Sequence, residues 1–233
     1  MTRAAAALPP VTLVRRYDTH RLIPSQYSEP GSVLALIADD EAQLADLFDL
    51  DHATNDRLLA ENQQLGGIGV HELVFGVPYY RMVNAAFTHA HPLGSRFNGP
   101  ARGAWYAAFE LRTAQAEVAF HKSVQLAEIG CLEEEVTFDD YQADVSAPLH
   151  DLREAPGFAP CLAPDSYVAS QLLAERLLAS GSMGVIYPSV RRRGGTCVGI
   201  FRPALVTHLR KGRTWHFRWK GKPAPVIEPV PEG

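Results

Sequence analysis

A tyrosine and a glutamate eleven residues apart are the residues of this chain best suited to chemistry. Tyr106 lies in the apolar run GAWYAAFEL, residues 103–111, which has the length and aromatic content of a strand. Glu117 falls near the start of the helical pattern that follows, where the peptide dipoles of a helix favour an anion. A strand, a turn and a helix in this order can bring a phenol and a carboxylate to one rim. On this pattern alone, a core tyrosine and a solvated helix acid are the simpler interpretation.

The turn before this strand, SRFNGPARGA, carries groups that suit an anion. It holds Arg96 and Arg102, whose guanidinium forks match phosphate oxygens, among Gly99 and Gly103. Glycines lack a side chain and let the backbone approach a ligand closely. The turn is neither a Walker loop nor a GxGxxG fingerprint. An ordinary β-turn with surface arginines is therefore the alternative.

The elements expected to position these residues begin with a strand over residues 13–23, which ends at Pro24 and Ser25. This strand places Arg21 near its end. Residues 32–69 have helical spacing and many acids, and they predict a helical insertion beside a mixed sheet. A strand-like run follows around residues 79–87. The helix that carries Glu117 is expected from about residue 113 to 126, with Thr113 as its cap.

The second half of the chain predicts further strands and one strong helix. The helix is expected from about Ser166 to Ser180, and a final strand or hairpin is expected within residues 207–221. A weakly alternating strand is expected at residues 133–138 and the residues that follow. Short apolar strands are expected at residues 183–188 and 196–201, and they enclose a loop with Ser189, Arg191, Arg192 and Arg193. Residues 221–233 read as a mobile, Pro-rich tail. Together the elements predict one α+β domain over residues 1–233, with its core at about 13–31 and 70–220.

Composition narrows the classes of function. A net charge of −4 and a pI near 6.1 give no overall electrostatic reason to expect nucleic-acid binding. The aromatic and basic run TWHFRWKGK reads as an exposed strand rather than a single-stranded nucleic-acid site. No signal peptide or membrane-spanning run is apparent, so we expect a cytoplasmic protein without membrane contact. The three cysteines lack a CxxC pair and predict neither disulfides nor a zinc site.

The histidines offer weak candidates. His89 and His91 in THAHP invite a metal interpretation, but the sequence places no matching acid or cysteine cluster, so we expect no metal. His121 stands four residues after Glu117 and shares its helix face. A packing role or a supporting role near Glu117 suits it better than proton transfer.

The order of these residues resembles the RES-domain family over roughly residues 13–205. The resemblance rests on Arg21 in HRLIPS, the SRFNG corner, Tyr106 in WYAAFEL, Glu117 in TAQAEVAFHK, and Ser189 after an apolar strand. The corner has RFN where the family has RWN. Arg81 in YYRMV is a rival for the early arginine, and Arg21 is preferred because Leu-Ile-Pro-Ser follows it.

The resemblance implies an ADP-ribosyltransferase-like fold, with a mixed, split sheet flanked by helices, that binds NAD⁺ and breaks its nicotinamide-ribose bond. Most members of the family are toxins of bacterial toxin-antitoxin pairs. Glu117 would stabilise the oxocarbenium-like ribose, and Tyr106 would stack on nicotinamide or ribose. Arg21 and Arg96 would hold the diphosphate, and Ser189 would hydrogen-bond near the same rim.

The acceptor of ADP-ribose stays open among phosphate, water and a protein. Phosphate as co-substrate would require a further cation, from Arg102 or the arginines at 191–193. Transfer to a protein would make the chain a mono-ADP-ribosyltransferase, and a non-enzymatic interaction module is the third hypothesis, motivated by the acidic insertion. The resemblance also implies a cognate Xre-like antitoxin with a helix-turn-helix domain, while a homodimer is compatible with a sequence that fixes no stoichiometry.

Overall fold

Residues 7–28 and 67–231 of the computed structural model are described below. They form seven strands, namely β1 (Val11–Pro24), β2 (Trp105–Ala108), β3 (Glu133–Asp151), β4 (Gly184–Pro188), β5 (Thr196–Ile200), β6 (Thr207–Lys220) and β7 (Val226–Pro229). The α-helices in this part of the chain are α2 (Tyr80–Thr88), α3 (Leu111–Glu128) and α4 (Val168–Ala179). Short 3₁₀ turns include Ser25–Tyr27, Val70–Glu72 and Pro156–Leu162.

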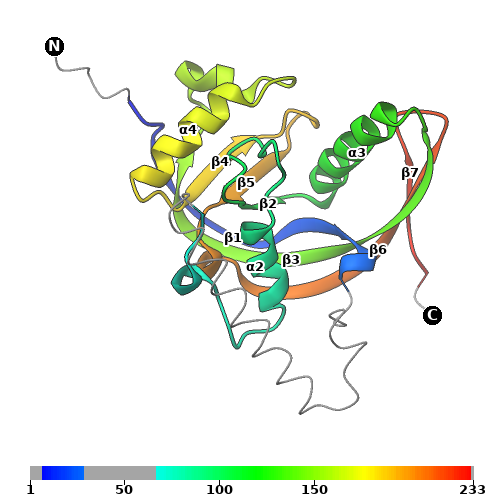
Figure 1. The fold of residues 1–233 in the computed structure, drawn as a ribbon, viewed down its shortest axis with the longest axis horizontal. Coiled ribbons are helices and arrows are strands. Elements are labelled where there is room, and N and C mark those ends of the chain that lie inside the picture. The colour runs from blue at the N-terminus through cyan, green and yellow to red at the C-terminus, as the bar shows by residue number, and fades with distance from the viewer. Residues whose placement is uncertain (1–6, 29–66, 232–233) are drawn as a thin grey trace.

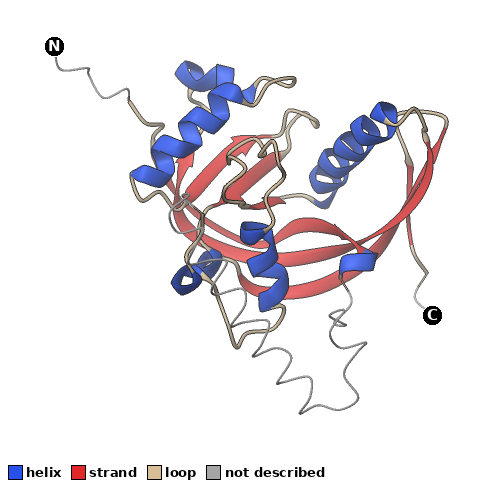
Figure 2. Cartoon of the chain, in the orientation of Figure 1, coloured by secondary structure: helices blue, strands red, loops and turns tan. Residues whose placement is uncertain are grey.

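All seven strands belong to one mixed sheet with the order β1-β2-β5-β4-β3-β6-β7. Because β3 also pairs with β1, the ladder that runs through β2, β5 and β4 returns to its first strand. Only the β3–β4 pair is parallel. The long strands β1, β3 and β6 curve together, and α3 lies on the concave side of the curve (Figures 1 and 2).

Strand β3 shows why the sheet curves around a core. Tyr141, Ala143, Val145, Ala147 and Leu149 are all buried, at every second position of the strand. Side chains alternate across a strand, so these five residues face one side. They pack there with the other inward apolar side chains, such as Trp105, Ile186 and Val198. A second apolar cluster on the other side of the sheet receives α3 and α4.

The expected α+β class, with a mixed sheet flanked by helices, is confirmed. The strands expected at residues 183–188 and 196–201 are present as the antiparallel pair β4 and β5. The expected helical insertion lies, up to residue 66, outside the described residues. In the described ranges, no helix is long and apolar enough to cross a membrane.

Three local expectations differ from the structure. The strand expected at residues 79–87 is wrong: this segment is α2, because Val83 and Phe87, four residues apart, turn one helix face into the core. The helix with Glu117 begins at Leu111 after the cap residue Glu110, so Thr113 lies within its first turn. The Pro-rich tail contributes β7, which pairs with β6 from Val226 to Pro229.

Candidate active site

Two cavities meet at Arg21 and Tyr106, which line both of them. We call one the α3 cavity: it has a volume of about 790 Å³ and lies between β1, β2 and the helix α3. The other, the α2 cavity, has a volume of about 950 Å³ and is lined by the end of β1 and by α2. Glu117 lines the α3 cavity and not the larger one. The acid, and not the volume, therefore marks the α3 cavity as the candidate for chemistry.

Glu117 is held by the loop between β4 and β5. Its Oε1 accepts a hydrogen bond from Ser189 Oγ at 2.5 Å and a longer one from Cys197 Sγ at 3.6 Å. Ser189 Oγ in turn accepts the backbone N–H groups of Arg191 and Arg192 at 3.1 and 3.0 Å. The serine hydrogen is thereby directed at the carboxylate. Burial, and then the nearby Glu117, raise the pKa of the Cys197 thiol, which keeps this thiol a donor.

Among the described residues, Arg21 presents a cation without an acid to balance it. Its Nη1 donates to the Tyr106 carbonyl at 3.1 Å, and the guanidinium lies 4.7 Å from the centre of the Trp105 ring. Its Nε is buried with no hydrogen-bond partner. Burial lowers the pKa of Arg21 to about 10, and within the described ranges no carboxylate forms an ion pair with it. An anionic ligand would supply the missing partner.

Tyr106 fixes the corner SRFNG to β2. Its hydroxyl donates to Asn98 Oδ1 at 2.8 Å and accepts the Phe97 N–H at 2.8 Å. Burial raises the pKa of this phenol. The hydroxyl is thus fully used within the protein, while the ring borders both cavities. A contact through the ring is what Tyr106 can offer a ligand.

Arg96 lines the α3 cavity but is 7% exposed and already bonded. Its Nη1 donates to the carbonyls of Ala163 at 2.8 Å and Cys161 at 3.3 Å, and its guanidinium lies 4.7 Å from the centre of the Tyr167 ring. Neutral carbonyls leave its positive charge uncompensated. Arg96 therefore adds positive potential to the cavity and anchors the segment around residues 161–163.

The structure does not bring Arg102 to either cavity. Its guanidinium makes two 2.9 Å bonds to Glu72 and one of 2.7 Å to the Phe201 carbonyl. The bonds from Arg102, together with one from Arg202, lower the pKa of Glu72 to about 2. Gly103 beside it serves packing, since a Cβ there would overlap the Ala86 carbonyl of α2.

The remaining candidate arginines, Arg81 and those at 191–193, do not line the α3 cavity. Arg81 lines the α2 cavity, with its guanidinium 5.7 Å from the centre of the Tyr80 ring. Arg191 donates to the Pro164 carbonyl at 2.6 Å, and Arg192 donates to Thr113 Oγ1 at 3.1 Å. Arg191, Arg192 and the exposed Arg193 line neither the α2 cavity nor the α3 cavity. The structure therefore assembles Arg21, Arg96, Tyr106 and Glu117 around one cavity, with Ser189 directly behind Glu117.

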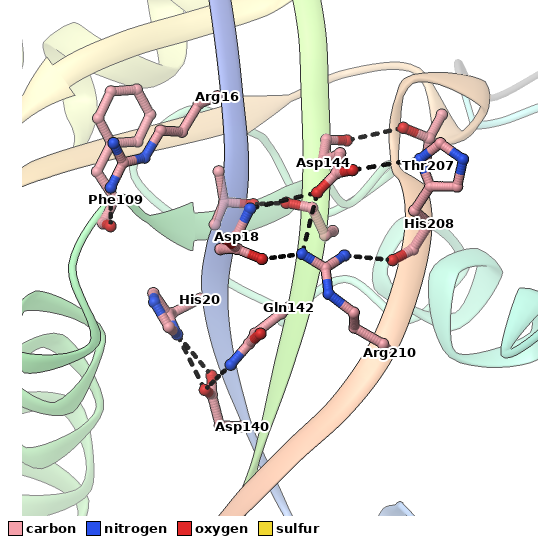
Figure 3. Close-up of polar contacts among 12 residues, drawn as sticks. Arg16, Asp18, His20, Phe109, Asp140, Gln142, Asp144, Thr207, His208 and Arg210 are labelled. Carbon is pink, nitrogen blue, oxygen red and sulfur yellow. Dashed lines mark hydrogen bonds and ion pairs between the residues drawn. The ribbon is translucent and has the colours of Figure 1, made fainter.

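One pair of residues at the site is joined by the fold and not by local sequence. His20, which also lines the α3 cavity, pairs with Asp140 of β3 at 2.9 Å (Figure 3). The partners are 120 residues apart, so no local spacing joins them. The adjacency of His20 to Arg21 in HRLIPS is the one hint that the sequence held. Across the described residues, no group of three or more metal-binding side chains is placed to hold an ion.

Comparison with known proteins places this geometry in a family. A family model described as RES domain matches residues 72–220. No curated protein matches the chain. A solved structure, the M. tuberculosis MbcT-MbcA toxin-antitoxin complex, is similar at 16% identity and a TM-score of 0.41, covering 56% of this chain and 73% of that chain. The family match spans more than half of the sequence, and the chain belongs to the RES-domain family.

Proposed function

We propose that the protein is the toxin of a toxin-antitoxin pair and depletes NAD⁺ by cleaving the bond between nicotinamide and ribose. Membership of the RES-domain family supports this reaction class. One observation carries the proposal: Glu117, held by Ser189, lines the same cavity as the guanidinium of Arg21, which pairs with no carboxylate of the described residues. NAD⁺ has the matching pair of features, a ribose that becomes cationic and an anionic diphosphate.

A carboxylate is the group that this bond cleavage requires. As nicotinamide leaves, positive charge develops on the ribose, much as in glycoside hydrolysis. Glu117 would lie beside that charge and stabilise it more strongly in the transition state than in the ground state. Nicotinamide departs as a neutral molecule and needs no general acid. One carboxylate beside the ribose, that of Glu117, therefore suffices.

The arginines would bind the anionic diphosphate of NAD⁺. With a pKa of about 10, Arg21 is cationic at neutral pH. A diphosphate oxygen would satisfy its buried Nε and balance its charge. Arg96 would add attraction without changing its bonds to the backbone. The Tyr106 ring would pack against nicotinamide or ribose.

Nicotinamide release from NAD⁺ by the purified protein tests the proposal. We expect release by the parent protein and a loss of about 100-fold or more in Glu117→Gln, which keeps the shape but removes the charge. Retained thermal stability of the variant would separate lost chemistry from lost folding. No release by the parent, with or without phosphate, would contradict the proposal.

Labelled NAD⁺ in a cell lysate tests the second reading, a mono-ADP-ribosyltransferase, because the same site would serve transfer to a protein. Covalent label on a discrete protein band would favour it. For the partner, we propose an Xre-like helix-turn-helix antitoxin, in keeping with the family and with the toxin-antitoxin complex named above. Co-expression of such a protein should restore growth and the NAD⁺ level.

A further inference from the structure

His20 and Asp140 form a fixed pair in the wall of the α3 cavity (Figure 3). His20 Nδ1 lies 2.9 Å from Asp140 Oδ2 and 3.1 Å from Oδ1. Asp140 is 2% exposed, and its Oδ2 also accepts a 3.0 Å hydrogen bond from Gln142 Nε2. The carboxylate is therefore held from two sides. It fixes both the orientation of the imidazole and the nitrogen that carries its hydrogen.

This orientation leaves the other ring nitrogen for a ligand. With Nδ1–H donating to Asp140, the neutral imidazole has its lone pair on Nε2. Nε2 has no hydrogen-bond partner within residues 7–28 and 67–231, and the side chain is 16% exposed. An oriented, accessible imidazole nitrogen is the usual acceptor of a proton in catalysis.

Two other histidines lack this combination. His121 lines the same cavity, but it is exposed, and no described residue orients its ring by a hydrogen bond. His208 has an acid partner, Asp144 at 3.2 Å, but its side chain is 81% exposed and lines neither cavity. His20 alone, among the described histidines, joins a buried carboxylate to the α3 cavity.

The number of cations around the α3 cavity helps to decide whether phosphate or water accepts the ADP-ribose. Arg21 and Arg96 are the only lysine or arginine residues of the described chain that line the α3 cavity. In the proposed function, Arg21 binds the diphosphate and Arg96 adds positive potential beside it. Arg102 and the arginines at 191–193 line neither cavity, so the described residues place no third lysine or arginine in the wall of the α3 cavity to bind a phosphate dianion. Water needs no cation, but it does need a base.

We propose that water is the acceptor and that His20 is the catalytic base that activates it, an inference that rests on the proposed function. The water oxygen forms a bond to the anomeric carbon of the ribose. The bond from that carbon to nicotinamide breaks, and its electron pair returns to the nicotinamide nitrogen. One water proton passes to His20 Nε2, giving an imidazolium that Asp140 stabilises before the proton leaves to solvent. The products are ADP-ribose, nicotinamide and a proton.

The test uses azide, a nucleophile that has no proton to lose. Nicotinamide release by the full-length protein and by His20→Gln is measured in water, with added phosphate and with added azide. We expect His20→Gln to lower kcat for hydrolysis by about 100-fold, with little change in KM. Azide should restore release in His20→Gln, with azido-ADP-ribose as product, and should not restore it in Glu117→Gln. Phosphate should change neither the rate nor the product of the parent.

Two controls keep the result specific. His208→Asn removes the exposed histidine that has an acid partner, and it should behave as the parent; the melting temperatures of all variants should agree. Three outcomes would overturn the role of His20. These are unchanged hydrolysis in a folded His20→Gln, a loss of hydrolysis in that variant that azide does not restore, and azide rescue in His121→Gln instead. Phosphate-dependent formation of ADP-ribose 1″-phosphate would overturn water as acceptor. No release by the parent with any nucleophile would instead reject the proposed function itself.

Discussion

The α2 and α3 cavities are similar in size and share Arg21 and Tyr106, yet their chemistry differs. The α3 cavity has Glu117 and His20 in its wall. The α2 cavity has no Asp or Glu among its described lining residues, and aromatic rings such as Tyr79 and Tyr80 contribute to its wall. In the proposed function, the larger cavity would therefore serve binding, and the smaller one would serve the cleavage of the bond.

This difference suggests a division of the proposed substrate at Arg21. Its diphosphate would lie at the point where the cavities meet, the reacting ribose in the α3 cavity, and the remote half in the α2 cavity. Changes in the α3 cavity should then affect kcat, and changes in the α2 cavity should affect KM. The predictions below test that separation.

The largest effect is expected from Glu117→Gln, which removes the carboxylate that accepts the hydrogen bond of Ser189. The kcat for nicotinamide release should fall by about 100-fold to 1,000-fold, because the charge on the ribose loses its stabiliser. NAD⁺ binding, measured by calorimetry, should persist. Equal loss of binding and turnover would mean that Glu117 serves binding rather than chemistry.

Arg21→Met should come next, and its effect should fall on KM. The change keeps an apolar stem over Trp105 and removes the charge that lies between the cavities. Loss of a charge-assisted hydrogen bond costs about 2 kcal/mol, and thus about a 30-fold rise in KM. Steady-state kinetics with NAD⁺ provide the measurement. A change in kcat alone would argue against a diphosphate at Arg21.

Ser189→Ala should have a smaller effect, confined to kcat. It removes the hydrogen that Ser189 directs at Glu117 Oε1 and releases two backbone N–H groups of the loop. We expect kcat to fall by about 10-fold, the equivalent of one hydrogen bond. Ser180→Ala, on an exposed serine outside both cavities, is the matched control. Equal rates in the two variants would show that Glu117 needs no such support.

Tyr80→Ala tests the α2 cavity and should act weakly. The ring packs near Phe75, with 5.8 Å between their centres, and lines the cavity. Loss of one aromatic contact should raise KM about fivefold and leave kcat unchanged. Kinetics with NAD⁺ will measure both constants. A fall in kcat would break the separation between the two cavities.

Glu72→Gln should leave activity unchanged and alter only the pH dependence of stability. The folded pKa of Glu72 is about 2, below its ordinary 4.5, because Arg102 and Arg202 bond to it. A carboxylate with a lowered pKa stabilises the fold when the pH is above its ordinary pKa, and this contribution is lost as the pH falls toward 2. Parent and variant should therefore differ in unfolding free energy at pH 6 and converge below pH 4. A constant difference down to pH 2 would contradict this pairing.

The sequence predicted those parts of the fold that local pattern determines. The short apolar runs of β4 and β5 have turn residues on both sides, and their boundaries agree with the structure within a residue or two. The sequence predicts a strand over residues 79–87, where the structure has a helix, because the spacing of Tyr79, Met82 and Val83 suits either element. Burial of Val83 and Phe87 decides for the helix, and only the tertiary structure supplies it.

The site likewise contains residues that the sequence identifies and residues that only the fold brings together. Tyr106, Glu117 and Ser189 stood out because their order resembles a family, and the structure joins the last two directly. Arg102 is a reasonable phosphate ligand by sequence, because an arginine does not indicate which group it will bind. Its actual partner, Glu72, lies thirty residues away. His20 and Asp140 meet only through the pairing of β1 with β3. Contacts of this kind follow from topology and not from spacing.

Strand β3 also makes the site sensitive to the length of the chain. Asp139 and Asp140 are neighbours, and consecutive side chains of a strand point to opposite faces. One binds Ser28 and Thr214, and the other binds His20. Loss of a single residue before them would shift the register and exchange these partners, turning the outward face of β3 inward. Any lineage of this protein should therefore tolerate substitutions along β3 far better than insertions or deletions.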